Sequence, residues 1–331
     1  MLVFALKGSA ALGDRVAACG GLQLAPHEER EFDGGEHKAR PLVDVAGQDV
    51  VVLQSLHGCD RASANDKLLR LLFFVGACRD HGARRVTAVA PYLAYSRKDR
   101  RTKPQDPVTA RYVAQLFEAV GASAVVTLEV HNLAAFENAF RCPTLHLSTD
   151  GLFADHIAAG LAGPGAKLPP AVVSPDLGGV KRAQLLREAL EARTGVAVPF
   201  GFMEKRRSAG VVSGTLFAGE VAGCAVYIVD DMICGGGTIL RAAKAARAHG
   251  AAEVHALAAH GLMTDAALEV LSRSALLDSI AISDGVEPCP AFGAALGARL
   301  RIVTCAPLLA EALARLHPPP GTGPAARGGS A

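Results

Sequence analysis

Residues 225–238, AVYIVDDMICGGGT, carry more information about the fold than any other stretch of this chain. The apolar run Ala225–Val229 is typical of a strand that is buried on both faces. Two carboxylates, Asp230 and Asp231, follow it, and the glycines at 235–237 lead into a segment whose apolar residues have helical spacing. The stretch therefore predicts a strand, a glycine-rich turn and a helix.

The turn itself predicts a binding site for a phosphate. Backbone N–H groups at a helix N-terminus bind anions, and the helix dipole adds to the attraction. The acids at 230 and 231 can accept hydrogen bonds from two neighbouring hydroxyls, so the site indicates a sugar phosphate. The alternative is an ordinary strand–helix turn with helix-capping acids. Three consecutive glycines soon after two acids make this alternative less favoured. A Walker A loop is excluded because no Gly-Lys-[Ser/Thr] is present.

Apolar runs and amphipathic helices alternate along almost the whole chain. Strands are predicted over 49–53, 86–90, 123–130, 171–174, 196–203, 253–258, 279–283 and 301–304. Helices are predicted over 65–80, 107–120, 180–193 and 307–316, with Asn65 capping the first and Asp106 followed by Pro107 starting the second. This alternation indicates an α/β protein whose parallel sheets are joined by right-handed crossovers. Two such sets predict two domains with a boundary near residues 147–150.

Composition narrows the class of protein. The chain has 331 residues, of which 50% are hydrophobic, but no apolar run approaches the roughly 20 residues of a membrane span. The net charge of +2 argues neither for nor against a nucleic-acid partner, and we expect none. The eight cysteines include no CxxC pair of the kind that binds zinc. We therefore expect a cytoplasmic protein with reduced thiols and no membrane partner.

The stretch at 225–238 resembles the phosphoribosyl-diphosphate (PRPP) binding loop of phosphoribosyltransferase-type folds. Its form, VDDMI followed by glycines and threonine, is most similar to ribose-phosphate pyrophosphokinases, also called PRPP synthetases, and the resemblance extends over roughly residues 1–316. It implies that Asp230 and Asp231 hold the ribose hydroxyls. It also implies that a loop holds the 5-phosphate, formed by Cys234, Gly235, Gly236, Gly237 and Thr238. Typical members of the family have aspartate where this chain has Cys234.

The resemblance also implies a domain plan. Two phosphoribosyltransferase-like domains are expected, each a mainly parallel sheet flanked by helices. Residues 1–147 would form the ATP side and residues 148–305 the ribose 5-phosphate side. A closing helix over 306–317 could pack on the first domain, and the Pro/Gly/Ala-rich residues 318–331 are expected to be disordered.

A basic segment, PYLAYSRKDRR at 91–101, follows the strand predicted at 86–90. Dense positive charge at a strand end suits a polyphosphate, although a solvated basic loop is an equally good explanation of the charge alone. The segment resembles the PYFGYARQDRR of the family, which implies that Arg97 and Lys98 contact ATP. Lys98 replaces the usual glutamine.

Two further strand ends carry candidate metal ligands. Taken alone, His131 is more often structural, and Asp176 in the stretch SPDLGG is a helix N-cap or a carboxylate for hydrated Mg²⁺. The pattern Glu129-x-His131 resembles the Asp-x-His of the family. The resemblance implies that His131 lies by Mg²⁺ and the ATP phosphates, and that Asp176 binds the metal.

The segment Glu204–Arg207 opens a predicted loop, which is either a mobile basic loop that closes on a reacting polyphosphate or an exposed hairpin tip. The resemblance implies that Lys205 and Arg207 are the catalytic cations, and that Arg207 also contacts ribose 5-phosphate.

The segment EFDGGE at 31–36 resembles the F-S-D-G-E of the family, which reaches the ATP of a neighbouring subunit. Phe32 could stack on the base and Glu36 could accept from its amino group, with Gly34 and Gly35 between them. The resemblance thus implies a homo-oligomer, either a dimer or a hexamer.

The resemblance implies an enzyme of nucleotide biosynthesis that converts Mg-ATP and ribose 5-phosphate into PRPP and AMP. Three alternatives stay open. The chain could be a phosphoribosyltransferase that consumes PRPP, a non-catalytic relative that regulates true synthetases, or a similar enzyme with another nucleotide or sugar phosphate.

Overall fold

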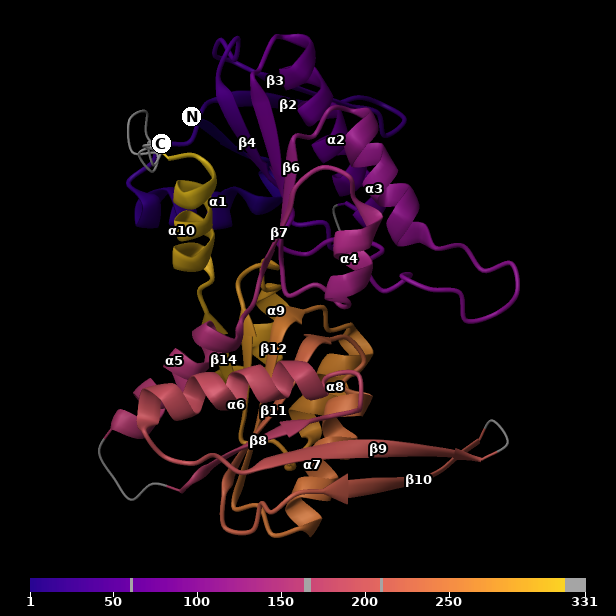
Figure 1. Ribbon diagram of the computed structural model, residues 1–331, viewed down its shortest axis with the longest axis vertical. Helices are drawn as coiled ribbons and strands as arrows, with labels where there is room; N and C mark the ends of the chain where they lie inside the picture. Colours follow the sequence, from indigo (N-terminus) through magenta and orange to yellow (C-terminus); the bar gives the residue numbers. More distant parts are fainter. Residues whose placement is uncertain (60–61, 164–167, 209–210, 319–331) are drawn as a thin grey trace, which may run out of the picture.

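The computed structural model describes residues 1–59, 62–163, 168–208 and 211–318, and of residues 205–208 and 211–215 the backbone alone. Two sheets, each with its own helices, follow one another along the chain (Figure 1). We propose that they are the two domains expected from the sequence, divided after Leu147. The tail expected to be disordered lies, from residue 319 on, outside the described residues. No helix among the described residues is long and apolar enough to cross a membrane.

The first sheet has five parallel strands in the order β1-β4-β5-β6-β7. Their bounds are Leu2–Ala5 (β1), Asp49–Leu53 (β4), Arg85–Val89 (β5), Ala124–Leu128 (β6) and Thr144–Leu147 (β7). Its helices are Ala10–Gly20 (α1), Ala64–Asp80 (α2), Thr109–Ala119 (α3) and Leu133–Ala139 (α4). A separate hairpin of His27–Glu31 (β2) and His37–Pro41 (β3) packs against α2. All five residues of β4 are buried, as expected of a parallel strand with both faces covered.

The second sheet has seven strands in the order β10-β9-β8-β11-β12-β13-β14, and only the β9–β10 pair is antiparallel. Their bounds are Pro170–Ser174 (β8), Phe200–Ser208 (β9), Val211–Ala218 (β10), Ala225–Ile233 (β11), Glu253–Gly261 (β12), Ser279–Ser283 (β13) and Leu300–Val303 (β14). Its helices are Asp150–Ala162 (α5), Val180–Thr194 (α6), Gly237–Ala248 (α7), Asp265–Arg273 (α8) and Pro290–Leu296 (α9). The expected α/β class with two mainly parallel, helix-flanked sheets is confirmed.

The last helix, α10 (Ala306–Leu316), returns to the first sheet and packs against α1 (Figure 1). Leu309 and Leu313 of α10 share a buried cluster with Val16 of α1. Just beyond α10, the imidazole of His317 lies 3.2 Å from the hydroxyl of Thr87 on β5. The end of the described chain is therefore anchored on the five-stranded sheet.

Several predicted element ends were wrong. Helix α2 is capped by Ser63 in a capping box with Asp66, two residues earlier than the predicted cap at Asn65. Helix α3 begins at Thr109 because the carboxylate of Asp106 instead accepts from the backbone N–H groups of Thr102 and Lys103 in the preceding loop.

Two strands of the second sheet run further than predicted. Strand β11 continues through Ile233 because its parallel pairing with β12 extends that far, so Asp230 and Asp231 lie within the strand. Strand β9 starts at Phe200 rather than Val196 and continues to Ser208, where the sequence predicted a loop. Its antiparallel partner β10 satisfies the backbone groups of residues 204–208 and keeps them extended.

Candidate functional site

A cavity of about 1080 Å³ lies where the carboxyl ends of strands from both sheets converge. Its described lining comes mainly from the ends of β6, β7, β8 and β11, from the segment after β5, and from the first turns of α6 and α7. The sequence-predicted residues that it brings together are Arg97, His131, Asp176, Asp230, Asp231, Cys234, Gly235, Gly236, Gly237 and Thr238. Residues as far apart in sequence as Arg97 and Thr238 thus share one site.

His131 and Asp231 form the closest polar contact between the two sheets in this cavity. The Nδ1 atom of His131 lies 2.7 Å from an Oδ2 oxygen of Asp231, whose side chain is almost fully buried. The hydrogen bond to Asp231 raises the pKa of His131 above its ordinary value, although burial opposes this. Burial of Asp231 also favours its neutral form, but the hydrogen bond from His131 and the charge of Arg182 hold the pKa of Asp231 below its ordinary value. The contact therefore favours an imidazolium on His131 beside a carboxylate on Asp231.

Asp230 behaves differently from its neighbour. Burial, followed by the adjacent charge of Asp231, raises the pKa of Asp230 to about 8. At neutral pH the two acids together therefore carry about one negative charge. The pKa values of Asp230 and Asp231 differ because their environments differ, although the residue type is the same. A pair of this kind can accept hydrogen bonds from sugar hydroxyls and can also donate one.

Arg182, in the first turn of α6, is a site residue that sequence reasoning missed. Its guanidinium donates to Glu129 at 2.9 Å and lies 3.8 Å from Asp230, so it joins the ends of β6 and β11. Glu129 also accepts from the backbone N–H and the hydroxyl of Thr149, and these contacts hold Glu129 at a positive φ of 43°. One feature of the sequence could have identified Arg182: it lies three residues after Gly179. A helix that follows SPDLGG begins beside the strand ends, so an arginine in its first turn lies near the site.

The glycine turn lies between β11 and α7, as the sequence predicts. Gly236 is the N-cap of α7 with φ of 70°, a conformation that favours glycine. Cys234 precedes the glycines, and Arg97 lies near its sulfur, with Nη1 at 3.9 Å. Burial raises the pKa of the Cys234 thiol, so the thiol is neutral at pH 7. The turn therefore presents backbone N–H groups and a neutral side chain.

Asp176 is held in a defined orientation at the end of β8. One of its carboxylate oxygens accepts from the backbone N–H of Gly179 at 3.1 Å, and its carbonyl accepts from the Ser174 hydroxyl at 2.6 Å. Gly179 allows this turn to close, since a Cβ atom there would lie 2.9 Å from the Ser174 oxygen. The Asp176 carboxylate thus lines the same cavity as the His131–Asp231 pair.

The basic segment after β5 divides between the cavity and solvent. Arg97 lines the cavity, whereas Lys98 is exposed and is absent from the lining that the described residues form. Asp99 also lines it and accepts from the Asn132 side chain at 2.7 Å, which ties this segment to the start of α4.

Lys205 and Arg207 lie on β9, opposite Thr215 and Val212 of β10. They belong to an extended hairpin rather than to the predicted loop, and residues 209–210 lie outside the described residues.

The segment 32–36 forms the turn of the β2–β3 hairpin, away from the cavity lining described above. The backbone N–H of Phe32 donates to the carbonyl of Glu36 at 2.9 Å, and Gly34 and Gly35 both adopt φ of 88°. Phe32 is 42% exposed, with the Arg30 guanidinium 5.1 Å from its ring centre. The turn thus presents an aromatic ring to solvent.

Comparisons with known proteins agree with this architecture. Residues 1–121 match the N-terminal domain of ribose phosphate pyrophosphokinase, and residues 172–322 match the phosphoribosyl synthetase-associated domain. The chain is 34% identical over 316 residues to a ribose-phosphate pyrophosphokinase of Caldanaerobacter subterraneus subsp. tengcongensis, with 95% of this chain and 94% of the relative covered. It is 33% identical to that of Hyphomonas neptunium, with 96% of each chain covered.

A solved structure is similar over nearly the full length. The phosphoribosylpyrophosphate synthetase from Mycobacterium smegmatis matches with a TM-score of 0.82 and 28% identity, covering 95% of this chain and 98% of that one. The resemblance inferred from the motifs is therefore confirmed.

Proposed function

The chain belongs to the ribose-phosphate pyrophosphokinase family, and we propose that it transfers diphosphate from Mg-ATP to ribose 5-phosphate, giving PRPP and AMP. The observation that carries this proposal is the cavity at the strand ends. There the His131–Asp231 pair, Asp176, Arg97 and the glycine turn converge from both sheets. A diol site, an anion site and cationic groups within one cavity are what joining a sugar phosphate to a polyphosphate requires.

The residues present fit Mg²⁺ carried by a nucleotide. Asp176 offers a hard carboxylate in a fixed orientation, and Mg²⁺ is often held by one or two carboxylates together with substrate phosphates and water. Among the described residues no cluster of three or more His, Cys, Asp or Glu side chains could hold a metal alone, which suits an ion that arrives with ATP. We propose that Asp176 holds this ion, and the ion would neutralise charge on the phosphate oxygens.

His131 is better suited to contact phosphate than to ligate the metal directly. Its Nδ1 atom is occupied by Asp231, and its raised pKa favours the imidazolium, which donates a hydrogen bond but cannot ligate a cation. We therefore propose that Nε2–H of His131 donates to the phosphates. His131 could ligate the metal only with its ring in the neutral form.

The acceptor sugar would lie along the end of β11. Asp230 and Asp231 would bind the ribose hydroxyls, and the backbone N–H groups of the turn Cys234–Thr238 would bind the 5-phosphate. Arg182 positions this pair, because it lies 3.8 Å from Asp230 and anchors to Glu129 across the cavity. The anomeric hydroxyl would then attack the β-phosphorus of ATP, and AMP would leave.

Positive charge for the migrating diphosphate would come from Lys205 and Arg207 on the β9–β10 hairpin, and Arg207 would also contact ribose 5-phosphate. Arg97 and Lys98 would contact ATP. The exposed turn Phe32–Glu36 would complete the nucleotide site of a neighbouring subunit, which makes the working form a homo-oligomer.

One observation favours a second candidate, a non-catalytic member that associates with active synthetases. Cys234 places a neutral thiol where typical members have an acid. If that acid orders the sugar's reacting hydroxyl, a chain with cysteine would bind both ligands and turn over neither.

The test is a direct assay of the purified full chain with Mg²⁺, ribose 5-phosphate and each nucleoside triphosphate in turn, measuring PRPP and nucleoside monophosphate. Equal amounts of PRPP and monophosphate are expected with ATP. The Lys205→Ala variant is expected to lose about 10²–10³ in turnover, as for one transition-state charge contact, while nucleotide affinity changes little. Stoichiometric ligand binding without PRPP from any triphosphate would favour the associated protein, and full turnover by Lys205→Ala would remove its catalytic role.

A further inference from the structure

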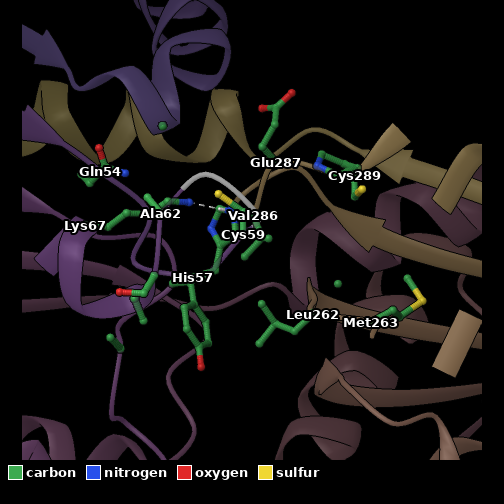
Figure 2. Close-up of a pocket in the computed structure, with 18 of the residues that line it drawn as sticks. Gln54, His57, Cys59, Ala62, Lys67, Leu262, Met263, Val286, Glu287 and Cys289 are labelled. Atoms are coloured by element: carbon green, nitrogen blue, oxygen red, sulfur yellow. Dashed lines mark hydrogen bonds between the residues drawn. The ribbon is translucent and has the colours of Figure 1, made fainter. Parts of the chain in front are cut away.

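A second and larger cavity, of about 1520 Å³, opens between the two sheets on the side of β4, β5, β12 and β13. Figure 2 shows residues that line it, with Gln54, His57 and Lys67 from the first sheet and its helix α2, and Leu262, Met263 and Val286 from the second. These residues also follow the carboxyl ends of parallel strands, where open α/β sheets bind ligands. The function proposed above uses none of them.

His57 and Lys67 are the most unusual groups in this cavity. Their residues are only 6% and 3% exposed, and the Nζ atom of Lys67 lies 3.2 Å from Nε2 of His57. Burial, followed by the charge of Lys67, lowers the pKa of His57 to about 3, so its ring is neutral. Because Nε2 accepts from the amine of Lys67, the ring hydrogen belongs on Nδ1. That buried Nδ1 atom has no hydrogen-bond partner among the described residues.

Lys67 itself is a buried cation. Burial lowers its pKa, and the Cys59 sulfur, which also interacts with the amine, only partly offsets this. No described carboxylate pairs with it. Taking an ammonium group out of water is costly unless a negative charge accompanies it, so an anion that enters the cavity would stabilise the charged form.

Of the four acidic side chains that line the cavity among the described residues, three are already engaged, and the fourth, Asp265, lies in the first turn of helix α8. Glu31 pairs with Arg70 at 3.1 Å, and Glu287 pairs with Arg15 at 3.4 Å. Glu29 accepts from two histidines of its hairpin and from a backbone N–H. Glu29, Glu31 and Glu287 therefore already have hydrogen-bond or ion-pair partners, and His57 and Lys67 line the same cavity.

The opposite wall is apolar. Met263, Val286 and Phe292 are each less than 10% exposed and line the cavity with Leu262. Figure 2 places Leu262 and Met263 across from His57. A pocket with an apolar wall and a few convergent polar donors is typical of small-molecule sites.

We infer that this cavity binds a small organic anion. Its negatively charged head accepts hydrogen bonds from Nδ1–H of His57 and from the Lys67 amine, and its apolar or aromatic body rests on Leu262, Met263 and Val286. Such a ligand contacts residues of both sheets at once, in a cavity that shares no described lining residue with the proposed catalytic cavity.

The site can be tested on the full chain with the fluorescent probe 1-anilinonaphthalene-8-sulfonate, which joins a sulfonate to an aromatic body. Its uncharged analogue, N-phenyl-1-naphthylamine, measures the apolar contribution alone. Lys67→Met is expected to weaken binding of the sulfonate about tenfold or more and that of the analogue less than about twofold. Lys38→Met, at an exposed position of β3, serves as the matched control and should change neither. Unchanged sulfonate affinity in Lys67→Met would overturn the proposal.

A second measurement uses the unmodified protein and so does not depend on how the variant folds. Acetic anhydride labelling followed by peptide mass spectrometry reports the acetylation rate of each lysine. Saturating sulfonate probe is expected to slow acetylation of Lys67 severalfold and to leave that of Lys38 unchanged. Equal acetylation of Lys67 with and without the probe would place the anion elsewhere and refute the site.

Discussion

Replacing Gly236 by alanine tests whether the backbone of the phosphate turn is held in the conformation described here. Gly236 has φ of 70°, and an L-residue in this left-handed region costs about 1–2 kcal/mol. A Cβ atom would also lie 3.1 Å from Cγ and Cδ2 of Leu271, which is fully buried and must shift. Both effects lower the free energy of unfolding, so about 1–2 kcal/mol is a lower estimate.

The neighbouring Gly235 offers a matched control in the same turn. Its φ lies outside the left-handed region, and an added Cβ atom would have no neighbour within 4 Å. Thermal unfolding followed by circular dichroism should show a Tm lower by about 2–8 °C for Gly236→Ala, at the 2–4 °C per kcal/mol typical of this size of unit. Gly235→Ala should stay within about 2 °C of the parent, as a surface change away from special backbone does.

The same pair of variants separates backbone strain from ligand contact. Because the N–H groups of the turn are expected to hold the 5-phosphate, Gly236→Ala should also weaken ribose 5-phosphate binding more than Gly235→Ala, as measured by calorimetry. Equal Tm values for the two variants would refute the left-handed conformation of Gly236 and with it the local geometry of the proposed phosphate site.

Three further outcomes are expected. Asp231→Asn should lower the pKa of His131 in an NMR titration, so that the ring loses its proton at a lower pH. Asp99→Asn should lower this pKa less, because Asp231 accepts from the ring and is the larger influence. An unchanged pKa of His131 in Asp231→Asn would contradict the pairing. Arg182→Met should lower the free energy of unfolding, measured in urea, by about 3–5 kcal/mol, because it leaves Glu129 charged and buried. Adding Glu129→Gln should recover part of this loss. If the effects of the two substitutions were simply additive, the two side chains would not be coupled. Iodoacetamide should label Cys234 slowly at pH 7 and faster as the pH rises toward the raised pKa of the thiol. Ribose 5-phosphate should slow the labelling further. A labelling rate that is the same with and without ribose 5-phosphate would place the sugar outside this turn.

Much of the α/β architecture follows from local sequence patterns. The mainly apolar runs at 49–53 and 279–283 become β4 and β13 with the predicted bounds, because a strand covered on both faces is predominantly apolar. The succession of strand, glycine turn and helix at 225–238 likewise recurs in the structure, since the glycine at 236 is needed for its positive φ. Each of these features depends on conformation and burial within one short segment.

Other features exist only once distant segments meet. His131 and Asp231 are 100 residues apart, and neither residue alone indicates the proton they share. The extended β9–β10 hairpin replaced a predicted loop because its strand pairing comes from a partner segment, not from local propensity. The buried contact of His57 with Lys67 lies against a wall supplied by the other sheet. Periodicity records which face of a segment is buried, whereas pKa values and cavities depend on which groups the topology brings within a few ångströms of each other.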